Sequence, residues 1–110
     1  MAKQKADLIQ GTLELLILRL LRSRELNGWE ITQQLRVASG DILSVTPGAL
    51  YPALHRLENR GLITAVWGPS ENNRKAKFYK LTTAGRKQLE TQRKNWERFC
   101  GAVALIMRDA

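Results

Sequence analysis

The sequence predicts a mainly α-helical domain with one small β-hairpin, and three observations predict this fold. Apolar residues in the first half recur with helical periodicity, in runs bounded by capping residues and glycines. Two short β-prone runs follow, joined by a loop of Gly, Pro, Ser and Asn. A long final run with apolar residues at seven-residue spacing predicts one more helix. A chain of 110 residues has room for one modest core, so we expect a single domain.

The first helix is predicted over residues 8–24. Its main apolar stripe is made of Leu13, Leu16, Ile17 and Leu20. Leu15 and Leu18 lie off this stripe, and a helix that is apolar nearly all round is buried on more than one side. The second side is predicted either to face another subunit, with Leu15 and Leu18 in a dimer interface, or to be covered by the chain's own C-terminal helix. The helix by itself favours neither alternative.

The second helix is predicted to start at Asn27 and to run to about Ser39. Asn27 has Glu30 three residues later, which is the pattern of a capping box. Gly40 then suits the left-handed position that ends many helices. Trp29, in the first turn, is predicted to pack between helices, with contact to a ligand as the less favoured alternative.

The third helix is predicted to begin at Thr46, whose hydroxyl would cap it, with Pro47 in the first helical position. Gly61 closes it, and its buried stripe is Leu50, Leu54 and Leu57. Pro52 lies inside the helix and cannot donate a hydrogen bond to the carbonyl of Gly48. We therefore expect a loose or 3₁₀-like first turn rather than a bend.

Strands are predicted over residues 62–67 and 74–82, and the last helix, capped by Thr82 or Thr83, continues to about Met107. Its seven-residue pattern contains Leu89, Trp96, Phe99, Val103 and Ile106. Two to three heptads are too few for a free-standing coiled coil, but they are enough to pack on a partner helix. These five residues are therefore predicted to mediate dimerisation.

Residues 1–82 have the order of a winged helix-turn-helix, a module that reads duplex DNA, and residues 83–110 would be a dimerisation helix in the same structural unit. The charge is concentrated at the hairpin and beyond it. Nine cations and two anions lie between Arg74 and Arg98, so this segment carries +7 of the formal net charge of +8. Such a field suits a polyanionic partner. A solvated helix face would account for the cations beyond Arg86 but not for the cluster on the hairpin.

The outer face of the third helix is predicted to contact DNA. With Leu54 facing inward, this face carries Gly48, Ala49, Pro52, His55, Arg56, Asn59 and Arg60. Arg56 and His55 can donate to base edges or phosphates, and the helix N-terminus at Thr46 suits a phosphate. Tyr51 lies between the two faces, so its hydroxyl can reach a phosphate. The alternative for each residue is an ordinary solvent-exposed face.

The hairpin is predicted to follow the DNA backbone or to enter the minor groove. The residues at or just past its tip are Asn72, Asn73, Arg74, Lys75 and Lys77. Contacts of this kind bind tightly but carry little sequence preference. Glu58, near the inner side of the third helix, is expected to form a structural ion pair or hydrogen bond rather than to contact DNA.

Nothing in the sequence predicts an enzyme, a cofactor or a metal site. His55 and Cys100 are the only residues of their kinds, and no metal-ligand spacing or nucleotide-binding loop is present. Cys100 lies on the apolar stripe, where packing is favoured over a redox role. The N-terminal residues do not form a secretory signal and no run is long enough to span a membrane, so we expect a cytoplasmic protein that does not bind membranes.

Four signatures resemble the PadR family of bacterial transcriptional regulators, specifically its short members with one C-terminal helix. They are GTLELLILRLL (11–21), NGWEI (27–31), GALYPALHRLENRGLI (48–63) and FYKLTTAGR (78–86). The resemblance implies a homodimeric winged helix-turn-helix repressor that binds inverted-repeat operators and is released by small molecules, often planar aromatic ones. Tyr51 corresponds to the recognition-helix Tyr of the family, while Trp29 stands where the family usually has Tyr.

The favoured hypothesis is a dimeric, sequence-specific DNA-binding regulator that represses nearby genes. Its predicted partners are an inverted-repeat operator, a second copy of the chain and a small aromatic effector. Trp96 and Phe99 would line the effector pocket between subunits, although plain interface packing is the favoured interpretation of the two rings. The alternative function is a winged-helix interaction module that binds an acidic protein or a membrane surface.

Overall fold

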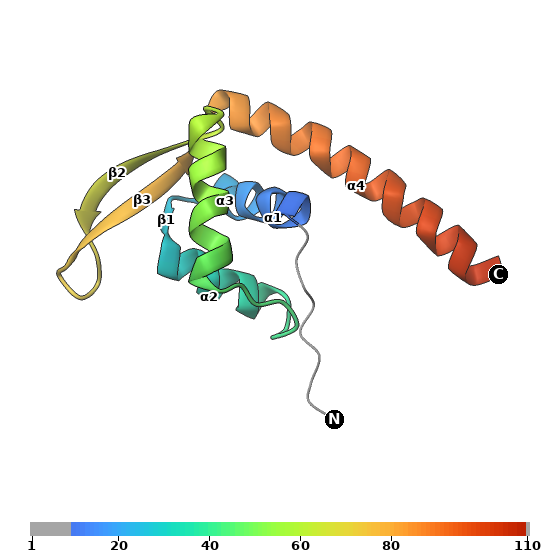
Figure 1. The fold of residues 1–110 in the computed structure, drawn as a ribbon, viewed down its shortest axis with the longest axis horizontal. Coiled ribbons are helices and arrows are strands. Elements are labelled where there is room, and N and C mark those ends of the chain that lie inside the picture. The colour runs from blue at the N-terminus through green and yellow to red at the C-terminus, as the bar shows by residue number, and fades with distance from the viewer. Residues whose placement is uncertain (1–9, 110) are drawn as a thin grey trace.

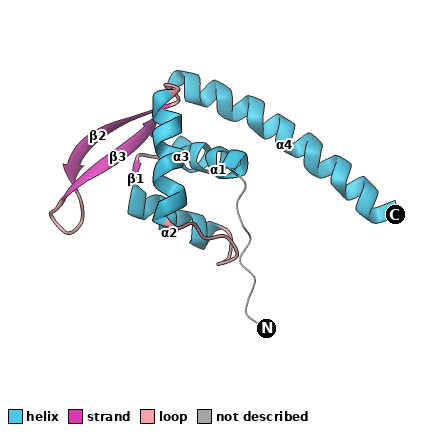
Figure 2. Ribbon diagram, in the orientation of Figure 1, coloured by secondary structure: helices cyan, strands magenta, loops and turns pink. Residues whose placement is uncertain are grey.

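The structure, a computed structural model, describes residues 10–109 of the chain. Its elements are α1 (Gln10–Ser23), β1 (Leu26–Asn27), α2 (Gly28–Ala38), α3 (Pro47–Asn59), β2 (Ile63–Pro69), β3 (Lys75–Leu81) and α4 (Thr83–Asp109). The β2–β3 hairpin projects from one side of a cluster formed by α1, α2 and α3, while α4 runs away from the other side (Figure 1). The prediction of a mainly α-helical fold with a small hairpin is confirmed (Figure 2).

The sheet has one strand more than the sequence predicted. Its order is β1-β3-β2, and all neighbouring strands are antiparallel. The extra strand, β1, has only two residues and pairs Leu26 with Tyr79 and Asn27 with Phe78. Two residues are too few to show the alternation by which a strand is recognised in a sequence. This short strand fixes the start of α2 beside the base of the hairpin.

Helix α1 lies at the centre of the core. It packs against α2, α3, α4 and β3, and the side chain of Leu18 is completely buried (0% exposed) within the single chain. Leu15 and Leu89 are buried as well, so the prediction that these three residues meet a second subunit is wrong. The alternative, in which the chain's own C-terminal helix and its neighbours cover the second side of this helix, is correct.

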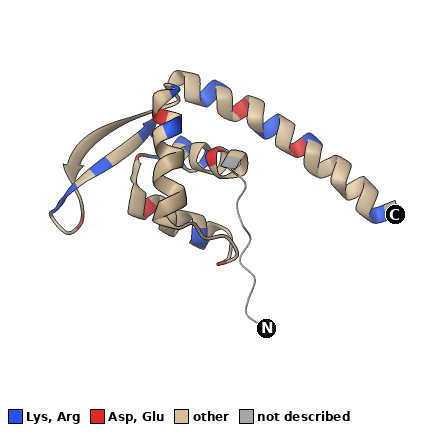
Figure 3. Ribbon diagram, viewed as in Figure 1, with Lys and Arg blue, Asp and Glu red and all other residues tan. Residues whose placement is uncertain are grey.

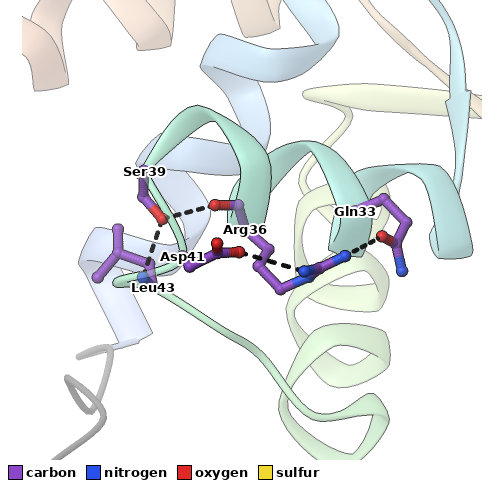
Figure 4. Close-up of polar contacts among 5 residues, drawn as sticks. All are labelled: Gln33, Arg36, Ser39, Asp41 and Leu43. Carbon is purple, nitrogen blue, oxygen red and sulfur yellow. Dashed lines mark hydrogen bonds and ion pairs between the residues drawn. The ribbon is translucent and has the colours of Figure 1, made fainter.

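Helix α2 begins and ends as its sequence predicts. The Asn27 side chain accepts from the backbone N–H of Glu30 (2.8 Å), and the Glu30 carboxylate accepts from that of Asn27 (2.9 Å), which completes the capping box. At the other end, Gly40 and Asp41 both have left-handed backbones, with φ of 64° and 66°. Arg36 donates to Asp41 (3.1 Å) and to Gln33 (2.6 Å), which holds this turn against the helix (Figure 4).

Helix α3 starts at Pro47, but its cap differs from the prediction. Thr46 occupies the capping position, but its hydroxyl accepts no hydrogen bond from a backbone N–H of the first turn. Its carbonyl instead accepts from the N–H groups of Ala49 (3.0 Å) and Leu50 (2.9 Å). The bond to Ala49 has the 3₁₀ spacing expected upstream of Pro52, which lies inside the continuous helix.

Helix α4 is joined closely to the end of the hairpin. The Thr82 hydroxyl accepts from the N–H of Gly85 (3.0 Å) and donates to the carbonyl of Gly61 (2.7 Å), so Thr82 is the cap. A Cβ atom at Gly85 would collide with the carbonyl oxygen of Leu62. Only glycine therefore allows the first turn of α4 to approach the β2 entry so closely.

Candidate nucleic-acid interface

The outer face of α3 is exposed, as the helical wheel predicted. Its exposed residues include Gly48, Ala49, Pro52, His55 and Asn59, and the preceding Thr46 is exposed too. The inner residues Leu50, Leu54 and Leu57 are fully buried against the core. Packing therefore fixes which side of the helix a partner can reach, while contact of these side chains with DNA remains a prediction.

Tyr51 joins α3 to the start of α2. Half of its surface is exposed, and its ring lies over Gly28. A Cβ atom at Gly28 would lie 2.5 Å from the phenolic oxygen, so any other residue there would displace the ring. The absence of a side chain at this position lets the hydroxyl lie at the surface between the two helices. The sequence could not reveal this contact because it joins residues that are distant in the chain.

Arg56 does not project freely from the helix, and its contact with DNA stays a prediction. Its Nε donates to the carboxylate of Glu14 in α1 at 2.8 Å, and Arg60 approaches the other oxygen of Glu14 at 3.5 Å. Glu14 is only 6% exposed and is the only buried charged side chain among the described residues. Arg56 would have to leave this carboxylate before it could contact a base edge.

Glu14 was not among the predicted site residues; in the sequence it interrupts the apolar run between Leu13 and Leu15. A carboxylate inside an otherwise apolar helix is nevertheless a signal, since a buried charge requires a partner. The identity of that partner cannot be read locally, because Arg56 is 42 residues away.

The tip of the hairpin presents its cations to solvent. Arg74 and Lys75 are exposed and have no carboxylate partner within residues 10–109. The neighbouring Asn72 and Asn73 are exposed as well, and Asn73 has a positive φ of 60° that closes the turn. Lys77, further along β3, instead forms an ion pair with Glu58 at 3.2 Å. The predicted structural role of Glu58 is thereby confirmed.

A groove of about 830 Å³ separates the start of α2 from the hairpin. Trp29, Tyr51, Trp67, Lys75 and Tyr79 are among the residues that line it. Trp29 is 65% exposed, so the prediction that it packs between helices is wrong. Its position in the first turn of α2 turns the ring toward the groove rather than toward the core.

Tyr79 forms the buried end of this groove, in β3. Burial raises the pKa of its phenol, because removal from water disfavours the charged form, while the nearby Lys77 ammonium lowers this pKa to a smaller extent. The Lys77 ammonium lies 5.5 Å from the centre of the Tyr79 ring. The same cation is thus held by a carboxylate and by an aromatic ring.

The second half of α4 leaves the body of the molecule (Figure 1). Trp96 is 42% exposed and Phe99 60% exposed, and their ring centres are 6.0 Å apart. Val103 and Ile106 continue this exposed apolar stripe. Together these four residues, which we call the α4 stripe, are left uncovered by the described part of the chain. They remain predicted dimerisation residues, whereas Leu89 belongs to the core.

Within residues 10–109, no three His, Cys, Asp or Glu side chains lie close enough together to bind a metal ion. Over the same residues, no helix is both long and apolar enough to cross a membrane. Lysines and arginines lie on β3 and its loop, at the end of α3, on α1 and α2, and on α4 (Figure 3).

Comparison with known families decides the class of this protein. The sequence model that describes the "Transcriptional regulator PadR-like family" matches residues 17–91 of this chain. These residues run from α1 through both strands of the hairpin into α4. The chain belongs to the PadR-like family. The predicted family is therefore confirmed, and so is the prediction that the chain is not an enzyme, because this is a family of transcriptional regulators.

Individual PadR-like relatives agree with this assignment. A transcriptional regulator of Mycobacterium tuberculosis is 34% identical over 94 residues, which are 86% of this chain and 84% of the relative. The structure of a transcriptional regulator from Clostridium thermocellum has a TM-score of 0.81 and 27% identity, and the match covers 90% of this chain and 96% of that one.

The negative transcriptional regulator PadR of Bacillus subtilis is 34% identical over 73 residues, which are 66% of this chain and 40% of PadR. A crystal structure of that PadR in complex with operator DNA has a TM-score of 0.65 and 32% identity. The structural match covers 73% of this chain and 46% of that PadR chain.

Proposed function

We propose that this PadR-like regulator binds duplex DNA as a homodimer and represses genes close to its own. The observation that carries the proposal is the exposed face of α3 beside a hairpin whose tip cations, Arg74 and Lys75, have no carboxylate partner among the described residues. An α-helix fits the major groove of duplex DNA, and cations without a carboxylate partner on an adjacent hairpin are available to bind phosphates. Repression is inferred from B. subtilis PadR, which is named as a negative regulator.

The dimer is proposed from the α4 stripe. Large apolar side chains at helical spacing cost free energy when they face water, and a second α4 packed against the first would remove this cost. Dimerisation of this kind places two copies of α3 and the hairpin on one duplex, which suits an operator built as an inverted repeat.

Release from DNA by a small aromatic molecule is a further part of the proposal. The Trp96 and Phe99 rings lie near each other on the α4 stripe, where they would flank the junction between two subunits. A flat ligand stacked there would change how the two subunits are held. Plain packing of the two rings in the interface is the competing interpretation, and quenching of Trp fluorescence by aromatic ligands in wild type but not in Trp96→Leu would distinguish them.

The proposal is tested by measuring binding to duplexes from the gene's own flanking regions and to random duplexes at moderate salt. We expect a clear preference for one flanking inverted repeat. Lys75→Ala should weaken binding to all duplexes about equally, because a phosphate contact carries no sequence information. It should also reduce the salt slope, by which we mean the steepness with which the logarithm of affinity falls with the logarithm of salt concentration, by about 1. Lys94→Ala makes the same change of charge on α4 and should leave the slope nearer to wild type.

Equal affinity for flanking and random duplexes would overturn sequence-specific regulation. Anionic lipid vesicles serve as a second arm of the experiment. Binding to vesicles but not to any duplex would favour an interaction module over a DNA-binding protein.

A further inference from the structure

Glu14 joins two parts of the molecule that have different tasks. It lies in α1, at the centre of the core, and its two carboxylate oxygens accept from Arg56 of α3 (2.8 Å) and from Arg60, which caps the end of α3 (3.5 Å). The carboxylate is almost fully buried, whereas the two arginine side chains are 37% and 49% exposed. The cations thus lie at the edge of the surface that is proposed to face DNA.

Stability alone does not explain a carboxylate in this position. Removing a carboxylate from water has a large cost, and an apolar side chain of similar volume is often at least as stabilising as a buried ion pair. The arginines do not require a partner for solvation either, because both reach water. The arrangement therefore calls for a reason that involves the cations themselves.

That reason emerges from the distribution of charge over α3 and the hairpin. Six cations lie between Pro47 and Leu81, and among the described residues half of them are held by carboxylates. The held cations are Arg56, Arg60 and Lys77, and the free ones are Arg74, Lys75 and Lys80. Every free cation lies on β3 or immediately before it, and none lies on α3. Helix α3 therefore offers hydrogen-bonding side chains and shape to a duplex, without an uncommitted arginine.

We propose that Glu14 withholds Arg56 and Arg60 from DNA phosphates and so keeps the affinity for random DNA low. This inference rests on the proposed DNA-binding function. Each phosphate neutralised by a cation adds affinity that is independent of sequence, so two free arginines on α3 would strengthen binding to every duplex alike. Glu14 would act as a positioning residue that improves discrimination without touching DNA.

The experiment compares wild type with Glu14→Gln. Glutamine has nearly the volume of glutamate and its carbonyl can still accept from Arg56, but it removes the charge that holds the two arginines. Affinity for a random duplex is measured at several salt concentrations. We expect tighter binding than wild type at low salt and a salt slope that is steeper by about 0.9 for each arginine that gains a phosphate contact.

Asp41→Asn is the matched control. It makes the same change of net charge and breaks the ion pair with Arg36 at the end of α2, on the opposite side of the molecule from the hairpin (Figures 1 and 4). Asp41 has a left-handed backbone, which asparagine tolerates as well as aspartate does. The salt slope of Asp41→Asn is expected to equal that of wild type.

Two further variants make the outcome independent of how well Glu14→Gln folds. In an otherwise wild-type chain, Arg56→Gln should leave the salt slope unchanged, because the arginine is already withheld. In the Glu14→Gln background, the same substitution should bring the slope back toward wild type. Thermal unfolding of all variants shows whether any loss of affinity comes from loss of folded protein.

The proposal is overturned if Glu14→Gln and Asp41→Asn have the same salt slope, or if Arg56→Gln alone lowers the slope of the wild-type chain. A uniform loss of affinity at an unchanged slope would mean that Glu14 is merely structural. If wild type prefers an operator while the Glu14→Gln slope does not change, the proposed function survives and this inference fails. If wild type binds no duplex at all, both fail.

Discussion

At the scale of single residues, burial decides what a side chain can do. Glu14 and Tyr79 are both removed from water, one as a charged group held by arginines and the other as a neutral phenol at the end of the groove. A buried charge must be paired to remain charged, whereas a buried neutral acid becomes harder to ionise. Tyr79 therefore couples the stability of the sheet to pH.

Stability is expected to fall as the pH rises above about 10, where tyrosine in the unfolded chain loses its proton. Burial raises the pKa of Tyr79 in the native protein, so over this interval the unfolded state binds fewer protons than the native state. The free energy of unfolding then decreases with increasing pH. The contribution is fully present below the unfolded pKa and is lost as the pH rises through the native one.

Urea unfolding between pH 8 and 11 measures this effect, with values chosen to span the titration of tyrosine near 10. Tyr79→Phe should reduce the decline, because phenylalanine has no proton to lose. An identical decline in Tyr79→Phe and wild type would show that other groups cause it.

At the scale of elements, α4 performs two tasks along its length. Its first turns belong to the core through Leu89 and Gly85, and its second half carries the α4 stripe outside the core. The seven-residue pattern continues through both parts with only Gln92 out of pattern, and the sequence analysis assigned Leu89 to the same interface as the residues beyond Gln92. Only the packing of α4 against α1 and β3 reveals where the core ends.

The element scale also separates what could be predicted from what could not. Helix α2 was predicted with its capping box and its left-handed end, because Asn27, Glu30 and Gly40 act within a few residues of one another. The Glu14–Arg56 pair was missed because it joins residues that meet only after α1 and α3 pack. Trp29 was predicted to pack between helices, yet the side that α2 turns to the core is set by tertiary contacts.

Trp96→Asp is expected to shift the protein from dimer toward monomer. An aspartate in the α4 stripe would place an unpaired charge in an apolar interface, and a change of this kind typically costs several kcal/mol. Sedimentation velocity over a range of concentrations measures the change. Lys94→Gln alters the net charge by the same amount on the opposite side of α4 and should sediment as wild type. An unchanged profile for Trp96→Asp would exclude the α4 stripe as the interface.

At the scale of the whole molecule, the proposed attraction of DNA phosphates and the proposed recognition of bases belong to different elements. The free cations lie at the hairpin, while the exposed face of α3 has few donors that can distinguish bases. One copy of α3 and the hairpin, which we call a reader, would therefore select weakly among DNA sequences. The second half of α4 runs away from the hairpin and α3 (Figure 1), so a dimer formed through it would hold two copies of α3 and the hairpin apart at a fixed separation. Selectivity would then come from the spacing of two half-sites as much as from either one.

The spacing of the two half-sites should therefore matter as much as their sequence. Wild type is expected to bind an operator with both half-sites about 100-fold more tightly than a duplex with one, since the second contact becomes intramolecular. Five added base pairs, about half a helical turn, would place the half-sites on opposite faces of the duplex and reduce the affinity to that of one half-site. Fluorescence anisotropy at constant salt measures these affinities, and an altered spacer sequence of unchanged length is the control. Trp96→Asp should bind all of these duplexes alike, whereas tight binding of wild type to the lengthened operator would mean that the two readers are not held at a fixed separation.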